Sequence, residues 1–311
     1  MLSCGVKGMV HCFDSEIFGE RGSIAFYIVK TEKPAIVETG PATIADRILK
    51  SLEDLRIDRD EVRYLFITHI HLDHSGGVGR LIKLLPNAKV VCHPKATKHL
   101  INPKKLWEAS KSALGGVAEA YGEPEPVGEG LIVPASERQK FDLGNDTMLS
   151  VLTPGHAPHH VSFFLERDKI LFPGDSAGVY GFGKVVPTTP PPFRLEEAIH
   201  SLDKMIELKP EFIAYTHFGF AENHDLLEKL RNRLIKWSEI ALAVAEKGGG
   251  TQELHSELMK NDEDYQELYE ITKESVIISG FHKLTLLGLV DYARLKLQNE
   301  SKMEFREPKN L

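Results

Sequence analysis

Apolar positions along this chain fall into short unbroken runs that alternate with stretches of helical spacing. Short apolar runs between turn residues are typical of buried strands, and they occur at residues 23–30, 35–38, 62–68 and 89–92. Apolar residues spaced three or four positions apart between Pro41 and Leu55 predict a helix that covers a sheet. The alternation of strands and helices continues to residue 217, so we predict an α/β fold.

The final part of the chain has helical spacing without strand-like runs. Residues 225–247 have this spacing and end at Gly248–Gly250, and glycines readily terminate a helix. Further helices are expected at residues 251–260, 264–273 and 281–297. We therefore predict two parts, an α/β domain at residues 1–220 and an all-helical extension at residues 221–311.

Composition and charge narrow the class of protein. The chain has 311 residues and a formal net charge of −7, which argues against a general nucleic-acid binder. No apolar run approaches the length of a membrane span, and the N-terminus is too short and too rich in glycine for a signal peptide. We expect a cytoplasmic protein that acts on a small molecule and binds neither nucleic acid nor membrane.

Cysteine is sparse, with only Cys4, Cys12 and Cys92. An odd, low count argues against a disulfide framework and fits a reducing cytosol. Cys92 closes a strand-like run and is expected to be a buried thiol, and Cys4 and Cys12 are expected to have structural roles.

The residues that point to chemistry gather directly after the apolar run Tyr64–Ile67. His69, His71, Asp73 and His74 lie within six positions, and imidazole and carboxylate groups are ligands of zinc, iron and manganese. Because alternate residues of an extended segment point the same way, His69 and His71 can bind one metal. Asp73 and His74 follow as the chain turns and can face a second metal. A polar surface cluster is the alternative, and distant partners argue against it.

Three such partners each follow a strand-like run. They are His156, Asp175 and His217, which come after residues 148–152, 169–171 and 212–214. Ends of strands commonly carry the functional residues of open sheets. Together with the motif after Tyr64–Ile67, four strand-like runs end in candidate ligands, which is hard to obtain by chance.

The motif His-x-His-x-Asp-His, followed in order by a single His, Asp and His, resembles the metallo-β-lactamase superfamily over about residues 10–220. The resemblance implies a four-layer αββα sandwich. It also implies two divalent metal ions, with zinc favoured and iron or manganese as alternatives. One ion would be held by three histidines and the other by Asp73 and two histidines, with Asp175 as the bridge; the two histidine sets are His69, His71 and His156, and His74 and His217.

The resemblance further implies a hydrolase that uses a metal-bridging hydroxide, with Asp73 orienting the nucleophile or relaying its proton. We expect an ester-type small-molecule substrate: a lactone, a thioester or a related acyl compound. Other functions within the superfamily remain open: a phosphodiesterase, a mononuclear iron oxygenase acting on a thiol or persulfide, or a non-catalytic regulator. The presence of all seven ligands favours the dinuclear hydrolase.

One position departs from the family pattern. Glu38-Thr39-Gly40 stands where family members often have Asp-Thr-Gly. The longer carboxylate can support a ligand histidine from behind, and the alternative is a solvated glutamate beside a turn.

Two segments could shape a pocket. Residues 94–122 form either a helical arm at the mouth of the site or a solvated helical hairpin. Residues 178–193 begin three positions after Asp175 and are rich in proline. We favour a substrate wall there over a merely stiffened loop, with Tyr180, Phe182 and Phe193 as candidate contacts.

The C-terminal helices are similar in layout to those of the subgroup that contains the bacterial quinolone-signal response thioesterase. That resemblance implies a cap over the active site. Phe281 and His282 begin the last expected helix and would line the pocket, the alternative being ordinary packing on the core. Pairing of two subunits into a homodimer is the other role open to these helices.

Overall fold

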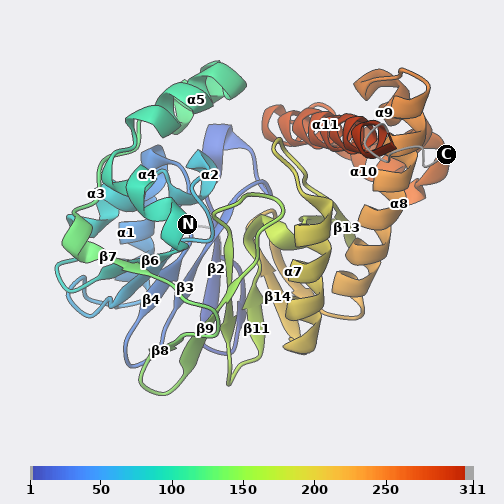
Figure 1. The fold of residues 1–311 in the computed structure, drawn as a ribbon. Helices are drawn as coiled ribbons and strands as arrows, with labels where there is room; N and C mark the ends of the chain where they lie inside the picture. Colours follow the sequence, from blue (N-terminus) through green and yellow to red (C-terminus); the bar gives the residue numbers. More distant parts are fainter. Residues whose placement is uncertain (1–2, 305–311) are drawn as a thin grey trace.

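The computed structural model describes residues 3–304, and their strands form two large sheets (Figure 1). The first sheet follows the chain order, antiparallel from β1 to β4 and parallel from β4 to β7. Its strands are β1 (Ser3–Lys7), β2 (Val10–Asp14), β3 (Ala25–Val29), β4 (Ala35–Val37), β5 (Tyr64–Phe66), β6 (Lys89–Cys92) and β7 (Ile132–Pro134).

The second sheet has the order β15-β14-β11-β10-β9-β8, and its β11–β14 pair is parallel whereas its other pairs are antiparallel. Its strands are β8 (Lys140–Asp142), β9 (Thr147–Leu152), β10 (Val161–Leu165), β11 (Ile170–Phe172), β14 (Phe212–Tyr215) and β15 (Gly219–Glu222). The hairpin of β12 (Val179–Gly181) and β13 (Lys184–Val186) stands apart from both sheets.

The helices lie outside the sheets and at the C-terminal end of the chain (Figure 1). In the first half they are α1 (Ala45–Asp54), α2 (Leu72–Ser75), α3 (Val78–Ile82), α4 (Thr97–Ile101), α5 (Lys104–Leu114) and α6 (Gly116–Tyr121). In the second half they are α7 (Leu195–Glu207), α8 (Leu226–Glu246), α9 (Thr251–Asn261), α10 (Glu263–Thr272) and α11 (Val276–Glu304).

Alternation along the strands explains the layers. In β3, Tyr27 faces an apolar cluster between the two sheets, whereas Phe26 and Ile28 face the cluster beneath α1 and α3. Because successive side chains of a strand point to opposite faces, a strand buried on both sides requires cover on both sides. A third cluster joins the outer face of the second sheet to α7 and the C-terminal helices. The predicted α/β sandwich of two sheets between helices is therefore confirmed.

The C-terminal helices form one packed unit with the second sheet. The most extensive contacts of α8 are with α11 and α7, and Trp237 of α8 is fully buried with its indole N–H donating to Asp262. The C-terminal helical region is as expected, except that α11 begins at Val276 rather than at Phe281. No helix in the described part of the chain is long and apolar enough to cross a membrane.

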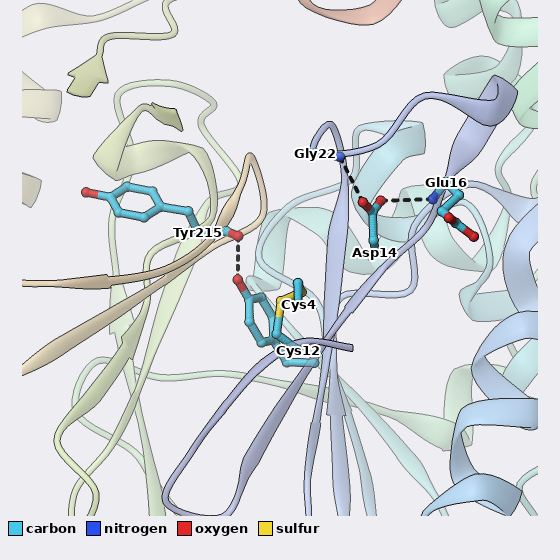
Figure 2. The surroundings of a disulfide bond; sticks show 7 residues. Cys4, Cys12, Asp14, Glu16, Gly22 and Tyr215 are labelled. Atoms are coloured by element: carbon cyan, nitrogen blue, oxygen red, sulfur yellow. Dashed lines mark hydrogen bonds between the residues drawn. A yellow bond between two sulfur atoms is a disulfide. The ribbon is translucent and has the colours of Figure 1, made fainter. Parts of the chain in front are cut away.

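A disulfide joins Cys4 to Cys12, a structural role that the low cysteine count did not lead us to expect (Figure 2). The two residues lie on β1 and β2, a hairpin that the sequence pattern did not reveal, and a register irregularity between Ser3 and Gly5 brings Cys4 beside Cys12. Their Cα atoms are 5.1 Å apart, within the range that a disulfide spans. An odd count cannot exclude one bonded pair, and Cys92 is the remaining buried thiol, as expected.

The segment at residues 178–193 is more ordered than the expected loop. It contains the β12–β13 hairpin, whose turn residues Phe182 and Gly183 both have positive φ. Strands of three residues are too short to show a period of two, so only the glycine could have indicated the turn. The proline-rich run that follows leads toward the predicted ligands.

Candidate metal centre

The seven candidate ligands meet at one edge of the two sheets. His69 and His71 follow β5, and Asp73 and His74 lie in the short helix α2. The other three ligands follow strands of the second sheet, with His156 after β9, Asp175 after β11 and His217 after β14. The two sheets thus place residues distant in sequence at one point, and all of these side chains are buried except His71, which is half-buried.

Two groups of ligand atoms can be distinguished by distance. In the first, Nδ1 of His71 is 2.8 Å from Nε2 of His69 and 3.3 Å from Nε2 of His156. In the second, Nε2 of His217 is 3.3 Å from Nε2 of His74 and 3.5 Å from Oδ2 of Asp73. Within each group the ligand atoms lie within 4.8 Å of one another, close enough to share one ion.

Asp175 stands between the two groups. Its Oδ2 is 3.4 Å from Nε2 of His156, and its Oδ1 is 3.3 Å from Nε2 of His74. Oδ1 is buried and has no hydrogen-bond partner in the described part of the chain. A buried carboxylate oxygen without a partner is costly, so this atom requires a cation or a donor that the side chains around it do not supply.

The outward nitrogens of four histidines are fixed by oxygen atoms. Nδ1 of His156 lies 3.0 Å from the carbonyl of Thr188, and Nδ1 of His217 lies 2.7 Å from that of Ser23. The remaining two contacts are Nδ1 of His69 with Thr68 Oγ1 at 3.0 Å and Nδ1 of His74 with Glu38 Oε1 at 3.1 Å. Such contacts place the proton on Nδ1 and leave the Nε2 lone pair facing inward.

The donor set therefore fits divalent metal ions. Carbonyl oxygens only accept, so His156 and His217 must donate through Nδ1 and direct lone pairs at the centre. Lone pairs on neighbouring nitrogens repel one another unless a cation lies among them. Imidazole and carboxylate donors in two groups, each with three candidate ligands, suit zinc, iron or manganese.

Glu38 is part of this arrangement rather than a solvated turn residue. Its side chain is 1% exposed, and Oε1 accepts a 2.5 Å hydrogen bond from the hydroxyl of Thr68. The hydroxyl of Thr216 lies 3.4 Å from the same oxygen. The backbone of Glu38 has φ of 64°, an unusual conformation for a residue with a Cβ. One carboxylate thus holds His74 directly and His69 through Thr68.

The electrostatics of the centre are dominated by burial and by facing charges. Burial, with the adjacent rings of His74 and His71, lowers the pKa of His69 well below its usual value. Burial also opposes the ionised form of Asp175, but the rings of His74 and His156 outweigh it and hold the pKa of Asp175 well below its usual range. Burial likewise opposes the ionised form of Asp73, but the rings of His74 and His217 outweigh it and lower the pKa of Asp73 to about 2. Both aspartates are therefore charged near neutral pH.

The five candidate substrate contacts are spread over different surroundings. The ring of Phe281 lies 4.6 Å from that of His217, between centroids, and Tyr180 stacks on Tyr215 at 5.2 Å. Phe193 is buried and shares the lining of a small cavity with His156. The structure brings these three aromatic residues to the surroundings of the centre.

The remaining two point elsewhere. Phe182 is 68% exposed at the turn of the β12–β13 hairpin. His282 is buried among the C-terminal helices, where Nε2 lies 3.1 Å from the hydroxyl of Thr272. Its ring contacts within residues 3–304 are with Tyr265 and Tyr269, not with a candidate ligand.

Sequence reasoning did not assign two groups that support the centre. Nε2 of His160 accepts a 3.1 Å hydrogen bond from the backbone N–H of Asp175, and its Nδ1 lies 2.9 Å from Thr153 Oγ1. The carbonyl of Thr188 orients His156, and the next residue, Thr189, donates its hydroxyl to the carbonyl of Thr285 in α11. His160 could have been suspected from its place near His156, but a backbone carbonyl leaves no signal in the sequence.

Comparison with known proteins agrees with this fold. The family model of the metallo-beta-lactamase superfamily matches residues 19–217, well over half of the chain. The chain therefore belongs to the metallo-β-lactamase superfamily.

Two relatives extend over most of the chain. The metallo-beta-lactamase fold-containing protein ST1585 of Sulfurisphaera tokodaii is 36% identical over 189 residues, which are 60% of this chain and 71% of that protein. The crystal structure of ST1585 superposes with a TM-score of 0.64 over 75% of this chain and 87% of its own, at 30% identity. The metallo-beta-lactamase family protein TTHA1429 of Thermus thermophilus shares the fold, with a TM-score of 0.62 over 88% and 89% of the two chains at 21% identity.

Two other relatives are named for an activity. The N-acyl homoserine lactonase AttM of Azorhizobium caulinodans is 31% identical over 119 residues, 37% of this chain and 40% of that protein. The thioesterase pkgB of Emericella nidulans is 29% identical over 183 residues, 56% of this chain and 43% of that protein. This chain thus spans less than half the length of either named enzyme.

Proposed function

We propose that this protein is a dinuclear metal-dependent hydrolase of ester-type small molecules, a lactone or a thioester. The observation that carries the proposal is the position of Asp175, whose two carboxylate oxygens face different groups of ligands. One carboxylate between two histidine groups is the arrangement expected of a bridge between two ions.

Each group of residues has a role in this proposal. His69, His71 and His156 would hold one ion, and Asp73, His74 and His217 the other. Zinc is the favoured ion, with iron or manganese as alternatives. When bound, such ions lower the pKa of a water molecule toward neutrality and stabilise the oxyanion of a carbonyl transition state.

The protein's own groups prepare the centre for this chemistry. The pKa of Asp73 near 2 makes its carboxylate an acceptor that orients a water proton, rather than a base that stores it near neutral pH. Glu38 and the carbonyls of Thr188 and Ser23 fix the rings of three ligands before substrate arrives. The aromatic ring of Phe281 beside His217 excludes water from one side of the centre.

The choice of a carbonyl ester over a phosphodiester rests on the relatives. The named lactonase and the named thioesterase both act on acyl compounds, and the matches to them support the same substrate class here. The helical extension would contribute the cover of the pocket. We place its boundary after β15, which runs to Glu222, so the catalytic part would end slightly beyond residue 220.

Hydrolysis of a defined panel tests the proposal. Protein stripped of metal and refilled with zinc, manganese or ferrous iron would be assayed with an acyl thioester, a lactone and a bis-aryl phosphodiester. Turnover of a carbonyl ester is expected, and Asp175→Asn should lower kcat by roughly 100-fold or more. Asp60→Asn, at an exposed aspartate, is the matched control. Full activity of Asp175→Asn would contradict the dinuclear proposal, and turnover of the phosphodiester alone would contradict the substrate class.

A further inference from the structure

A basic helical arm projects beside the metal centre. Residues 93–114, which include α4 and α5, contain five lysines and one glutamate, whereas the whole chain carries a net charge of −7. Lys111 pairs with that glutamate, Glu108, and lies over the ring of Trp107. The other four lysines are on the surface and form no ion pair with a carboxylate of residues 3–304; they are Lys95, Lys98, Lys104 and Lys105.

This concentration of charge is unusual within the molecule. Lysines elsewhere on the surface commonly have acidic partners, such as Lys83 with Glu125 and Lys169 with Glu211. Unpaired lysines on adjacent turns repel one another, and the repulsion is relieved by an anion. Figure 1 shows α5 standing out from the body at the same end of the molecule as α2, which carries two of the candidate ligands.

A row of histidine rings connects the centre to these lysines. The ring of His159 lies 6.1 Å from that of His71, the most exposed candidate ligand, and 6.3 Å from that of His99 in α4. Nδ1 of His159 is buried without a hydrogen-bond partner among the described residues. Lys98 directly precedes His99 in α4, and α4 contacts α5, which carries Lys105. Burial lowers the pKa of His99, and the charges of Lys98 and Lys105 lower it further.

We propose that Lys98 and Lys105 bind a phosphate group carried by the leaving portion of the substrate. This inference rests on the proposed function and narrows its substrate to a thioester with a phosphorylated tail. His99, which follows Lys98 in α4, lies two ring-to-ring steps beyond His71, so an anion bound there would belong to a part of the substrate remote from the scissile carbonyl. Lysine binds phosphate as a point charge, and two lysines match the double charge of a phosphate monoester.

Kinetics with matched substrates tests the assignment. The same acyl group would be presented as a coenzyme A thioester, which carries phosphate groups, and as an uncharged N-acetylcysteamine thioester. In the double variant Lys98→Gln/Lys105→Gln, the ratio of the KM for the coenzyme A thioester to that for the uncharged one should rise roughly 10-fold. The rise should shrink as salt is added. Lys209→Gln/Lys247→Gln, at two exposed lysines of other elements, should leave the ratio unchanged.

An uncharged thioester with a carboxylate on its acyl group separates the two kinds of anion. If the double variant impairs this substrate and spares the coenzyme A thioester, the anion lies on the acyl side and the assignment is overturned. KM values that are the same in the double variant and the wild type for all three substrates overturn the assignment as well.

A binding measurement keeps the arm distinguishable from the reaction. Trp107 lies on α5, whereas Trp237 is fully buried in α8, so fluorescence that is lost in Trp107→Phe reports on the arm. Titration with coenzyme A should change this signal in the wild type and require roughly 10-fold more ligand in Lys98→Gln/Lys105→Gln. Saturable, lysine-dependent binding without thioester hydrolysis would support the anion site and contradict the proposed reaction. Hydrolysis without such binding would contradict the anion site alone.

Discussion

Oε1 of Glu38 lies 3.1 Å from Nδ1 of His74. Glu38 directly follows β4, a strand remote in sequence from the motif that contains His74. The same oxygen accepts the hydroxyl proton of Thr68, which lies 3.0 Å from Nδ1 of His69. One buried carboxylate thereby orients a histidine in each of two ligand groups.

Replacement of Glu38 by glutamine should therefore weaken the binding of metal to both groups. The loss of charge behind His74 lowers the basicity of the ring, and changes of this kind typically cost about 10–100-fold in metal affinity. Competition with a chelator of known affinity measures the effect, and Glu129→Gln at an exposed position is the control. A metal affinity equal to that of the wild type would mean that Glu38 only fills space.

Alanine substitutions at two glycines of α11 should have opposite effects on the free energy of unfolding. A Cβ on Gly288 would lie 1.7 Å from the carbonyl oxygen of Thr189, whereas a Cβ on Gly280 would meet nothing within 4 Å. Gly288→Ala should therefore lower the free energy of unfolding by roughly 2–4 kcal/mol because helix and segment must separate. Gly280→Ala should raise it by about 0.5–1 kcal/mol, the usual gain from alanine in a helix. Urea unfolding of both variants measures these changes, and equal effects would refute the close contact between Gly288 and Thr189.

The disulfide is expected to stabilise the N-terminal hairpin. Cys4 and Cys12 are separated by eight positions, and a closed loop of this length contributes about 2–3 kcal/mol in the chain-entropy description. Cys4→Ser should be less stable than the wild type by that amount in urea, and reductant should bring the wild type to the same level. A wild type that does not respond to reductant would show that the bond is absent in solution.

The pH dependence of stability should have a component from His282. Burial and the neighbouring His255 lower the pKa of His282 to about 4 from its ordinary value of 6.5. Between these pH values His282 is protonated in the unfolded chain but neutral in the folded protein. Its contribution to the free energy of unfolding is therefore complete above pH 6.5 and is lost as the pH drops toward 4. The slope approaches about 1.4 kcal/mol per pH unit at its steepest.

His282→Gln isolates this component. Unfolding would be followed from about pH 7.5 down to about pH 5, with the same metal loading for both proteins. The variant should lose less stability on acidification than the wild type, with a difference on the order of 1–3 kcal/mol at the acidic end. Parallel profiles for the two proteins would rule out a contribution from His282.

The sequence predicted the layers and the convergence of the candidate ligands because both depend on local patterns. His69, His71, Asp73 and His74 follow one apolar run, and strand ends in a sandwich of two sheets must converge on few edges. The groups that support the candidate ligands were harder to predict from the sequence. Thr188 acts through its carbonyl, which any residue possesses, and in the hairpin of β1 and β2 the apolar positions are interrupted by Gly5 in β1 and by His11 in β2.

The side chains around the pocket show the same limit. His282 was expected to face the substrate because it follows Phe281, yet neighbouring residues of a helix point about 100° apart. The helix that starts at Val276 directs Phe281 toward His217 and His282 toward Thr272. The packing of α11 on α8, α9 and α10 fixes this rotation, and no pattern within α11 determines it.

The two consecutive threonines at positions 188 and 189 join the centre to α11, since the first accepts a hydrogen bond from His156 and the second donates one to Thr285. A ligand that tightens His156 must then favour the seated position of the helix, and by thermodynamic reciprocity the seated helix must favour that ligand to the same extent. Loading with metal should consequently protect α11 from proteolysis and slow its amide hydrogen exchange. The C-terminal helices would in this way respond to whether the candidate centre holds metal.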